Sequence, residues 1–176
     1  IDTETSSLDA HQAELVGISL CYKPGHSGYI PLAHKSKNNL DSSKVLKILK
    51  PYLEDKSIKK IGQNIKFDYI VFFKRGIKIN SIEDTMLMSY VLDAGRNRHN
   101  LDTIAEIHLQ HKNISFKELV GTGKKQLNFS EVDITLAKDY AAEDADITLR
   151  LYKLFFQNLK NEKLLQIYNN FEKPMI

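Results

Sequence analysis

Two strands near the start of the chain are marked by alternation of apolar and other residues. In residues 14–22, ELVGISLCY, every second side chain from Val16 to Tyr22 falls on one face of an extended segment. Residues 28–32, GYIPL, are predicted to pair with that strand as a hairpin. A third, short strand is predicted in SIKKIGQN, residues 57–64.

Apolar residues at helical spacing dominate the rest of the chain. Gly76 is predicted to end one of these helices, and Asp84 is predicted to cap the start of the next. The Gly/Lys-rich segment 121–129, GTGKKQLNF, is predicted as a loop. The segments predicted to contain helices are 40–55, 65–76, 81–93, 99–109, 134–160 and 162–173.

The order of these elements predicts the fold class. Strands lie early and helices dominate late, which indicates an α/β layer fold with a mixed central β-sheet flanked by α-helices. The length of 176 residues, without repeats or low-complexity linkers, favours a single domain over residues 1–176. The chain begins at Ile1 and ends in FEKPMI. We therefore expect a fragment of a longer polypeptide with its first strand clipped.

Composition narrows the class of protein without identifying it. Hydrophobic residues make up 42% and charged residues 27%, which is typical of a folded globular chain. The net charge of +3 and the pI near 8.8 are compatible with a polyanionic partner but are weak evidence for one. Cys21 is the only cysteine, so no intrachain disulfide can form and a reducing, cytoplasmic compartment is expected. No apolar run has the length of a membrane span, and no signal peptide is recognised.

Two carboxylates open the chain in the sequence IDTETSSLD. On a strand, Asp2 and Glu4 point to the same face, where their like charges repel and raise each other's pKa. A divalent cation is the usual agent that compensates such a pair. The alternative is a solvated strand end or turn.

A carboxylate also interrupts the apolar stripe of the long helix 134–160. At 100° per residue, Asp144 falls among Ala137, Ala141 and Leu151, where a charge must be paired or bound to metal. Tyr140 lies four residues before Asp144, so the two side chains are neighbours. The alternative is a buried Asp bonded to a tyrosine or a backbone amide. Ordinary solvated charges are expected on the opposite face and flank, at Asp139, Glu143, Asp146 and Arg150.

The helix IKFDYIVFF repeats this pattern. Asp68 sits among aromatic and branched apolar residues, and the alternative is an Asp in the first helical turn favoured by the helix dipole, with Asn64 as N-cap. Together with Asp2, Glu4 and Asp144, Asp68 completes a set of four carboxylates without matching His or Cys. Such a set suits Mg²⁺ or Mn²⁺ rather than Zn²⁺, and can hold two ions about 4 Å apart for attack on a phosphodiester.

Three motifs that contain these residues resemble those of the DEDD exonuclease superfamily, whose members have a ribonuclease H-like fold. Asp2-Thr3-Glu4 matches Asp-x-Glu, and NIKFD, which ends at Asp68, matches the second motif. Tyr140 to Asp144 matches Tyr-x-x-x-Asp, where tyrosine in place of histidine indicates the tyrosine subclass.

Longer segments resemble the proofreading 3′-5′ exonuclease domains of bacterial DNA polymerase I. They occur in the same order over nearly the whole chain, and FEKPMI resembles the junction to a polymerase domain. Departures are small: Phe67 stands where tyrosine is frequent, and Asn100 where a second acidic residue is often found. The matching segments are DTETSSLD, KIGQNIKFD, EDTMLMSYVLDAG, HNLDTIAE, GKKQLNF and YAAEDADITLRL.

The resemblance implies a role for each carboxylate in hydrolysis of the terminal 3′ phosphodiester to a nucleoside 5′-monophosphate. Asp2, Glu4 and Asp144 would bind the first of two divalent ions, Mg²⁺ or Mn²⁺, with Zn²⁺ the alternative at that first site. Asp2 would bridge to the second ion, which Asp68 would hold largely through water. Tyr140 and Glu4 would orient the attacking water, with Tyr140 as a donor rather than a base because its reference pKa is about 10.

The resemblance also implies which residues grip a single-stranded 3′ end. Leu8 matches an apolar wedge at the last base, and Phe116 matches an aromatic residue that stacks on a base. Core packing is the alternative for these two, and plain surface charge is the alternative for Lys66 and Arg98. The further residues matched to the substrate are Thr5, Gln63, Asn64, Lys66 and Arg98.

Two other functions stay open at this point: an RNA 3′-5′ exonuclease of the same superfamily, and a non-catalytic module that supports a polymerase. The retained carboxylates argue against the second, and the polymerase-like tail argues against the first. The partners implied by the resemblance are a single-stranded 3′ end of DNA and a polymerase domain in cis. The domain is expected to be monomeric, without a membrane partner, in the bacterial cytoplasm and associated with the nucleoid.

Overall fold

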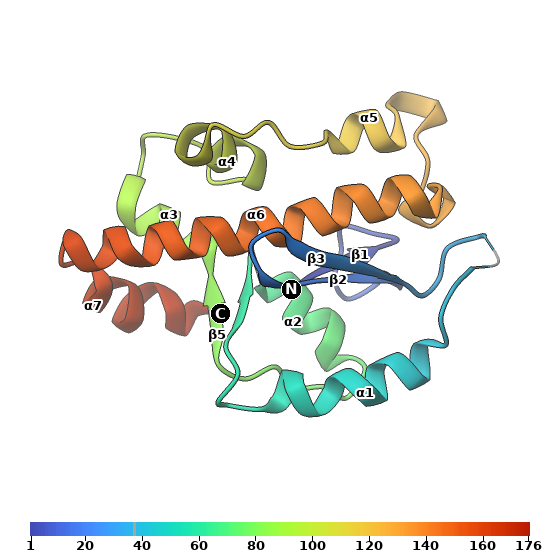
Figure 1. Cartoon of the computed structure of the whole chain (residues 1–176), viewed down its shortest axis with the longest axis horizontal. Coiled ribbons are helices and arrows are strands. Elements are labelled where there is room, and N and C mark those ends of the chain that lie inside the picture. The colour runs from blue at the N-terminus through green and yellow to red at the C-terminus, as the bar shows by residue number, and fades with distance from the viewer. Residues whose placement is uncertain (37) are drawn as a thin grey trace.

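The structure, a computed structural model, describes residues 1–36 and 38–176 and contains an early group of strands followed by helices (Figure 1). The strands are β1 (Asp2–Thr5), β2 (Leu15–Lys23), β3 (His26–Pro31), β4 (Lys60–Gly62) and β5 (Ile82–Asp84). The main helices are α1 (Ser42–Glu54), α2 (Lys66–Phe73), α3 (Thr85–Asp93), α4 (Leu101–Leu109), α5 (Phe116–Val120), α6 (Ile134–Asn161) and α7 (Leu165–Ile167). Short 3-10 and π turns cover Gly123–Lys125, Phe129–Glu131, Tyr168–Glu172 and Lys173–Met175.

The strands form an antiparallel group and a parallel pair. β2 lies between β1 and β3 and is antiparallel to both, as the hairpin pattern predicts. β4 and β5 are parallel, with Lys60 opposite Ile82. The amino group of Ile1 donates to the Ile61 carbonyl at 2.8 Å, which joins the two groups. The predicted mixed sheet flanked by helices is therefore confirmed.

Helix α6 is the central element of the molecule. In Figure 1, α6 crosses the molecule. The strands, α1 and α2 lie on one side of it, and α3, α4 and α5 lie on the other. The apolar stripe of α6 is buried as predicted, with Ala137, Ala141, Leu151 and Phe155 at 0% exposure. Asp133 caps its first turn by accepting from the Thr135 amide at 2.8 Å. None of the helices in the described ranges has the length and apolar character to cross a bilayer.

Hydrophobic cores lie on both sides of α6. One joins the sheet to α1 and α2 around Ile18 and Phe72, which are both fully buried. The second joins α3, α4 and α6 around Met88 and Phe155, and it takes in Tyr168 from the C-terminal segment. The ends of the chain are thus tied to the same body as the sheet.

The structure differs from the sequence prediction in three places. Residues 82–84 form strand β5, which was not predicted, although Asp84 caps α3 as expected. Helix α5 was also not predicted; it is short and begins at Phe116. The predicted helix 162–173 is broken into α7 and tighter or wider turns, and Pro174 at the start of the last turn lacks an N–H to continue an α-helix.

Gly17 in β2 gives room to the ring of Tyr29 in β3. A Cβ atom at Gly17 would lie 2.0 Å from the Tyr29 hydroxyl oxygen. That hydroxyl also forms a 2.7 Å hydrogen bond with the His34 ring, so it is not free to move aside. Gly17 of β2 is paired with Glu4 of β1, so the Tyr29 ring lies against the part of β2 that is next to this carboxylate.

Replacement of Gly17 by alanine is expected to displace Tyr29 and to lower the free energy of unfolding by about 1–3 kcal/mol, as overpacking does. Gly28→Ala is the matched control, because no atom of the described residues lies within 4 Å of the place that a Cβ would take at this strand glycine. Its effect should stay within about 0.5 kcal/mol. Urea denaturation measures both variants, and equal effects would contradict the close approach of Tyr29 to Gly17.

Candidate active site

Strand β1 presents the first two carboxylates of the site. Asp2 is opposite Ser19 and Glu4 is opposite Gly17 in the antiparallel ladder with β2, and the register becomes irregular directly after Glu4. Glu4 is buried and Asp2 is half-buried. The predicted pair of carboxylates therefore sits on an ordered strand inside the molecule and not at a solvated turn.

Helix α6 brings Asp144 to the same place. The ligand atoms of Asp2, Glu4 and Asp144 all lie within 4.8 Å of one another. Asp144 is 9% exposed, and its Oδ1 atom is buried without a hydrogen-bond partner in the described part of the chain. An unpaired carboxylate oxygen at this burial is costly unless a cation or water meets it. The three side chains thus form the core of a candidate metal site.

Asp68 lies beside this cluster and not within it. It is buried in the first turn of α2, as predicted, and its Oδ1 accepts a hydrogen bond from the Thr3 hydroxyl of β1. It does not belong to the group whose ligand atoms all lie within 4.8 Å. The negative charge of Asp2 nevertheless acts on Asp68, so the two are electrostatically linked.

Burial dominates the electrostatics of the four carboxylates. It raises the pKa of Asp2 to about 6, and it raises the pKa values of Glu4, Asp68 and Asp144 well above their usual range. The charge of Asp2 adds to the rise of the pKa at each of the other three. Among the side chains that the structure describes, no Lys or Arg forms an ion pair with any of the four. The donor set is all oxygen, so the residues fit a hard divalent cation.

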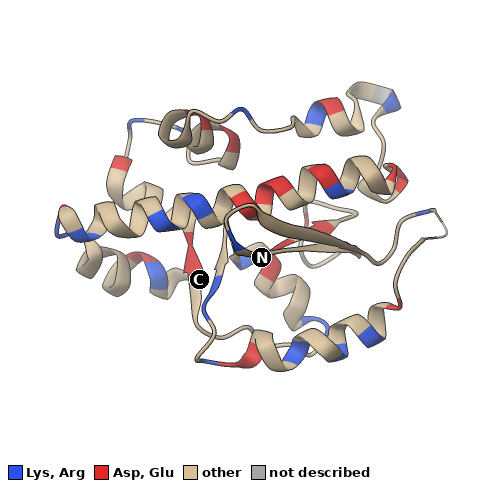
Figure 2. Ribbon diagram, viewed as in Figure 1, with Lys and Arg blue, Asp and Glu red and all other residues tan. Residues whose placement is uncertain are grey.

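A cleft of about 820 Å³ opens beside the carboxylates. Its walls come from β1 and the loop after it, from the turn before α2 and the start of α2, and from the start of α5 and the segment between α5 and α6. Figure 2 shows acidic positions along the stretch of α6 that runs beside the strands, whereas basic positions recur along α1. The lining includes Asp2, Glu4, Thr5, Leu8, Gln63, Asn64, Asp68, Phe116, Gln126, Leu127, Asn128 and Phe129.

Most of the residues predicted to bind substrate lie on this cleft. Leu8 is 96% exposed and Phe116 is 38% exposed, so neither is a core residue. Thr5, Gln63 and Asn64 complete the predicted residues that line it.

Lys66 and Arg98 do not line the cleft. Both side chains are exposed to solvent, and neither belongs to the described lining. Arg98 is next to His99, whose carbonyl oxygen accepts from the Gln63 amide at 2.7 Å. Lys66 follows the lining residue Asn64 by two positions, and Arg98 is joined to the lining only through His99. The role of both basic residues in binding stays a prediction.

Tyr140 lies between the carboxylates and the aromatic wall. Its ring centroid is 5.9 Å from that of Phe116 and 6.2 Å from that of Phe129. Burial raises the pKa of the Tyr140 hydroxyl, and the charges of Asp144 and Glu4 raise it further. The hydroxyl therefore stays protonated at neutral pH and can act as a donor.

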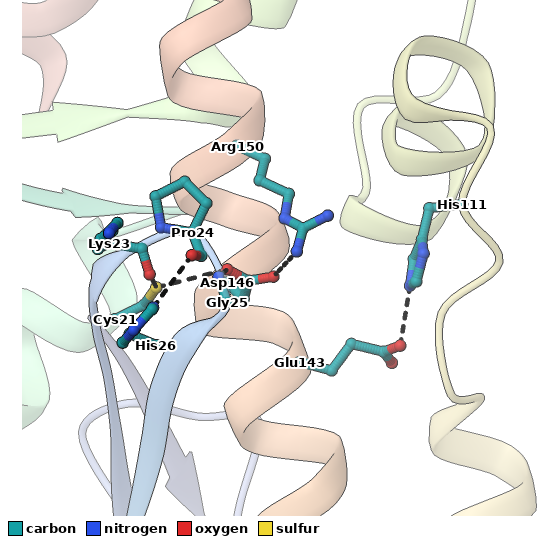
Figure 3. A network of polar contacts seen from close by, with 9 residues as sticks. All are labelled: Cys21, Lys23, Pro24, Gly25, His26, His111, Glu143, Asp146 and Arg150. Atoms are coloured by element: carbon teal, nitrogen blue, oxygen red, sulfur yellow. Dashed lines mark hydrogen bonds and ion pairs between the residues drawn. The ribbon is translucent and has the colours of Figure 1, made fainter.

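Two charges of α6 that were expected to be solvated hold the helix in place instead (Figure 3). Asp146 is buried, accepting from the Gly25 amide at 2.6 Å and pairing with Arg150 at 2.7 Å. Glu143 accepts from the His111 ring at 2.8 Å and from the Ile114 amide at 2.7 Å. The prediction for Asp146 and Glu143 was wrong because the hairpin turn and the segment before α5 cover those faces of α6. Both contacts fix the part of the helix that carries Asp144.

Sequence reasoning also missed part of the cleft. The segment 121–129 was predicted only as a loop, yet Gln126, Leu127 and Asn128 line the cleft. The Asn128 side chain donates to the Ser6 carbonyl at 2.8 Å and so bridges two rims. Nothing in the local pattern signals this long-range contact.

The fold and the site together define a class of protein, an α/β nuclease that presents clustered carboxylates beside a cleft. A 3′-5′ exonuclease family model matches residues 1–160, and the chain belongs to that family. It is 41% identical to DNA polymerase I of Rhizobium leguminosarum and 42% identical to DNA polymerase I of Pseudomonas aeruginosa, in each case over 99% of the chain. It covers 19% and 20% of those relatives, so the chain spans about a fifth of their length.

Solved structures share the fold. Brucella melitensis NrnC matches with a TM-score of 0.70 at 23% identity, over 93% of this chain and 73% of that one. The POL domain of Pol1 from M. smegmatis in complex with DNA primer-template and dNTP matches with a TM-score of 0.68 at 18% identity, over 92% of this chain and 24% of that one. A structure of NrnC with bound Mg²⁺ also matches, with a TM-score of 0.67. The predicted ribonuclease H-like fold is confirmed.

The raised pKa values give the metal-free protein a pH-dependent stability. Free carboxylates titrate near pH 4 in an unfolded chain, whereas the Asp2 pKa is about 6 here and those of its neighbours are also raised. The folded state thus holds more protons in this window, and its stability falls as the pH rises from about 4 to about 7. In chelator, the melting temperature should fall across that range.

Asp144→Asn removes one of the repelling charges. In chelator at about pH 7.5, its melting temperature should exceed that of the wild type, on the order of 5 °C. Added Mn²⁺ should raise the melting temperature of the wild type and leave that of the variant nearly unchanged. Asp139→Asn, at an exposed position on the same helix, is the control and should behave as wild type. A variant that melts lower than wild type in chelator would mean that Asp144 is structural.

Proposed function

We propose that this chain is the proofreading domain of a DNA polymerase I, removing single-stranded or mispaired 3′-terminal nucleotides of DNA as 5′-monophosphates. The observation that carries the proposal is the cluster of Asp2, Glu4 and Asp144 beside a cleft with exposed apolar side chains on its walls. Membership of the 3′-5′ exonuclease family and the identity with DNA polymerase I support it. Residues 1–176 are proposed to be one domain of that longer chain, with a polymerase domain in cis.

The carboxylates supply the chemistry by holding cations. Asp2, Glu4 and Asp144 are proposed to hold the first divalent ion, and Asp2 with Asp68 to hold the second, Mg²⁺ or Mn²⁺ being the candidates. Bound ions of this kind lower the pKa of water and neutralise charge on a phosphodiester and its leaving oxygen. Without such ions the four carboxylates would repel the phosphate, because no described Lys or Arg pairs with them.

Tyr140 is proposed to orient the water that attacks phosphorus. Its raised pKa keeps the proton on the hydroxyl, so Tyr140 donates a hydrogen bond and Glu4 accepts one. The rings of Phe116 and Phe129 hold the Tyr140 ring in place. Tyr140 therefore contributes by position and not as a general base.

The walls of the cleft suit unstacked bases. Leu8 projects from a loop that two hydrogen bonds between Ser6 and Glu14 close. The Ser6 amide donates to the Glu14 carbonyl, and the Glu14 amide donates to the Ser6 hydroxyl, both at 3.0 Å. The 96% exposure of Leu8 thus belongs to an ordered loop and suits an apolar wedge. The Phe116 ring lies parallel to that of Phe129, at a 6° angle, and presents an aromatic surface on the same cleft. Base stacking on such a surface is typically worth about 1–3 kcal/mol.

Tyr140→Phe keeps the ring and removes one hydroxyl. We expect the exonuclease rate to fall by about 10–10³-fold, as is typical of one oriented polar group. The metal concentration that gives half the maximal rate should change little. Tyr52→Phe serves as the control for loss of a hydroxyl, because Tyr52 is an exposed residue of α1 and is not among the described residues that line the cleft. An unaltered rate in Tyr140→Phe would remove this residue from the mechanism.

The substrate is tested with 3′-labelled oligonucleotides of one sequence. Initial rates should be highest on single-stranded DNA, lower on a mispaired primer end and lowest on a paired end, because unpairing must precede entry. An end blocked at its 3′ side should survive, and Asp144→Asn controls for contaminating nuclease. Faster cleavage of RNA than of DNA would favour the RNA exonuclease alternative. No difference between wild type and Asp144→Asn would favour the non-catalytic module.

A further inference from the structure

The turn that leads from β4 into α2 is held in an unfavourable backbone conformation. Asn64, on the wall of the cleft, has φ of 56°, in the left-handed region that a residue other than glycine seldom adopts. Such a conformation persists only where the surroundings fix it. Helix α2 starts directly after this turn, at Lys66, and carries Asp68 in its first turn. The turn therefore determines where that carboxylate lies.

The Asp84 carboxylate is the group that fixes this turn. It is 1% exposed at the end of β5, and it accepts from the Asn64 amide at 3.1 Å and from the Ile65 amide at 3.0 Å. One oxygen, Oδ1, serves Asn64, and the other, Oδ2, serves Ile65. Oδ1 also caps α3 by accepting from the Met86 amide at 2.8 Å. A single side chain thus joins α3, the turn and the start of α2.

Neighbours of Asp84 complete the same clamp. The Thr85 hydroxyl is within donating distance of two acceptors, the Gly62 carbonyl at 3.1 Å and the Gln63 side-chain oxygen. The other end of the Gln63 side chain donates to His99, whose ring is bonded to Ser89 at 2.8 Å. The Gln63 amide is therefore engaged with protein groups at both ends.

The C-terminal segment contacts β5 at Asp84 and at the residue before it. The Tyr168 hydroxyl accepts from the Asp84 amide at 3.1 Å and donates to Glu83 at 2.9 Å. Lys173 pairs with the same Glu83 carboxylate at 2.8 Å. Figure 1 places the C-terminus close to β5, in agreement with these contacts. The chain of bonds runs from the C-terminal segment through β5 to the wall of the cleft.

We infer that Asp84 is a positioning residue for the nuclease site, acting through the Asn64–Ile65 backbone on the cleft wall and on the place of Asp68. The inference rests on the proposed function for its catalytic consequence. Asp84 is not among the described residues that line the cleft, so it acts on the site through the turn and does not contact the substrate. A misplacement of about 1 Å can cost on the order of 10²-fold in rate.

Asp84→Ser separates this role from simple helix capping. Serine is a good N-cap and can still accept from the first turn of α3, but it has one oxygen and cannot serve the turn as well. Asp41→Ser is the matched control, since Asp41 caps α1 by accepting from the Ser43 and Lys44 amides and does not line the cleft. Both variants are assayed well below their melting temperatures on a single-stranded DNA oligonucleotide.

For Asp84→Ser we expect kcat to fall by about 10–100-fold, with a shift in the Mn²⁺ concentration that gives half the maximal rate and little change in KM. Amide hydrogen exchange should become faster at Asn64 and Ile65 in Asp84→Ser and stay unchanged there in Asp41→Ser. A kcat within about twofold of wild type, or unchanged exchange at those amides, would overturn the inference.

The design distinguishes this failure from failure of the proposed function. If the wild type cuts no substrate, the proposed function fails, while amide exchange and Mn²⁺ binding still decide whether Asp84 positions the turn. If Asp84→Ser does not fold, Asp84→Asn takes its place under the same criteria. It keeps the volume and one acceptor but turns the second oxygen into a donor that faces an N–H group.

Discussion

The structure depends on one unfavourable interaction, the mutual repulsion of carboxylates that are buried beside the cleft. Asp2, Glu4 and Asp144 bring their ligand atoms within 4.8 Å of one another, and Asp68 lies close enough to feel the charge of Asp2. In water such a group would separate. Here each member is on a regular element that other contacts hold, so burial and, after it, repulsion raise the pKa values, and one Asp144 oxygen has no hydrogen-bond partner in the described part of the chain. The arrangement is costly without a cation and favourable with one.

The rest of the fold can be understood as the framework that resists this repulsion. Asp146 and Glu143 bind the hairpin turn and the segment before α5, on either side of Asp144, so α6 cannot rotate or slide away from β1. Asp84 holds the turn before Asp68 in the same way, and Tyr168 in turn accepts from the Asp84 amide. Strand β1 and the start of α2 supply both carboxylates and part of the cleft wall, and other residues of the wall add apolar surface where unstacked bases would lie.

Local patterns were sufficient for much of this. The hairpin, the long helix and the carboxylate in its apolar stripe follow from periodicity alone. The position of Asp68 among apolar residues grouped it with the others before the motif resemblance did. Strand β5 was not predicted, because a strand of three residues carries no periodic signal and its parallel partner β4 is remote in sequence. Asp146 was assigned to solvent because helical geometry gives the face of a side chain but not what covers that face. Asp84 was predicted only as a helix N-cap, because its hydrogen bonds to the Asn64 and Ile65 amides join residues about twenty positions apart.

A divalent cation is expected to replace protons on these carboxylates when it binds. Calorimetric titration of the protein with Mn²⁺ at about pH 6, repeated in two buffers of different ionisation enthalpy, counts the protons released on binding. Because the Asp2 pKa is about 6 and those of Glu4 and Asp144 are raised as well, binding should release protons at that pH, and the number should decline as the pH is raised. Binding without proton release, or no binding by the wild type, would contradict the account.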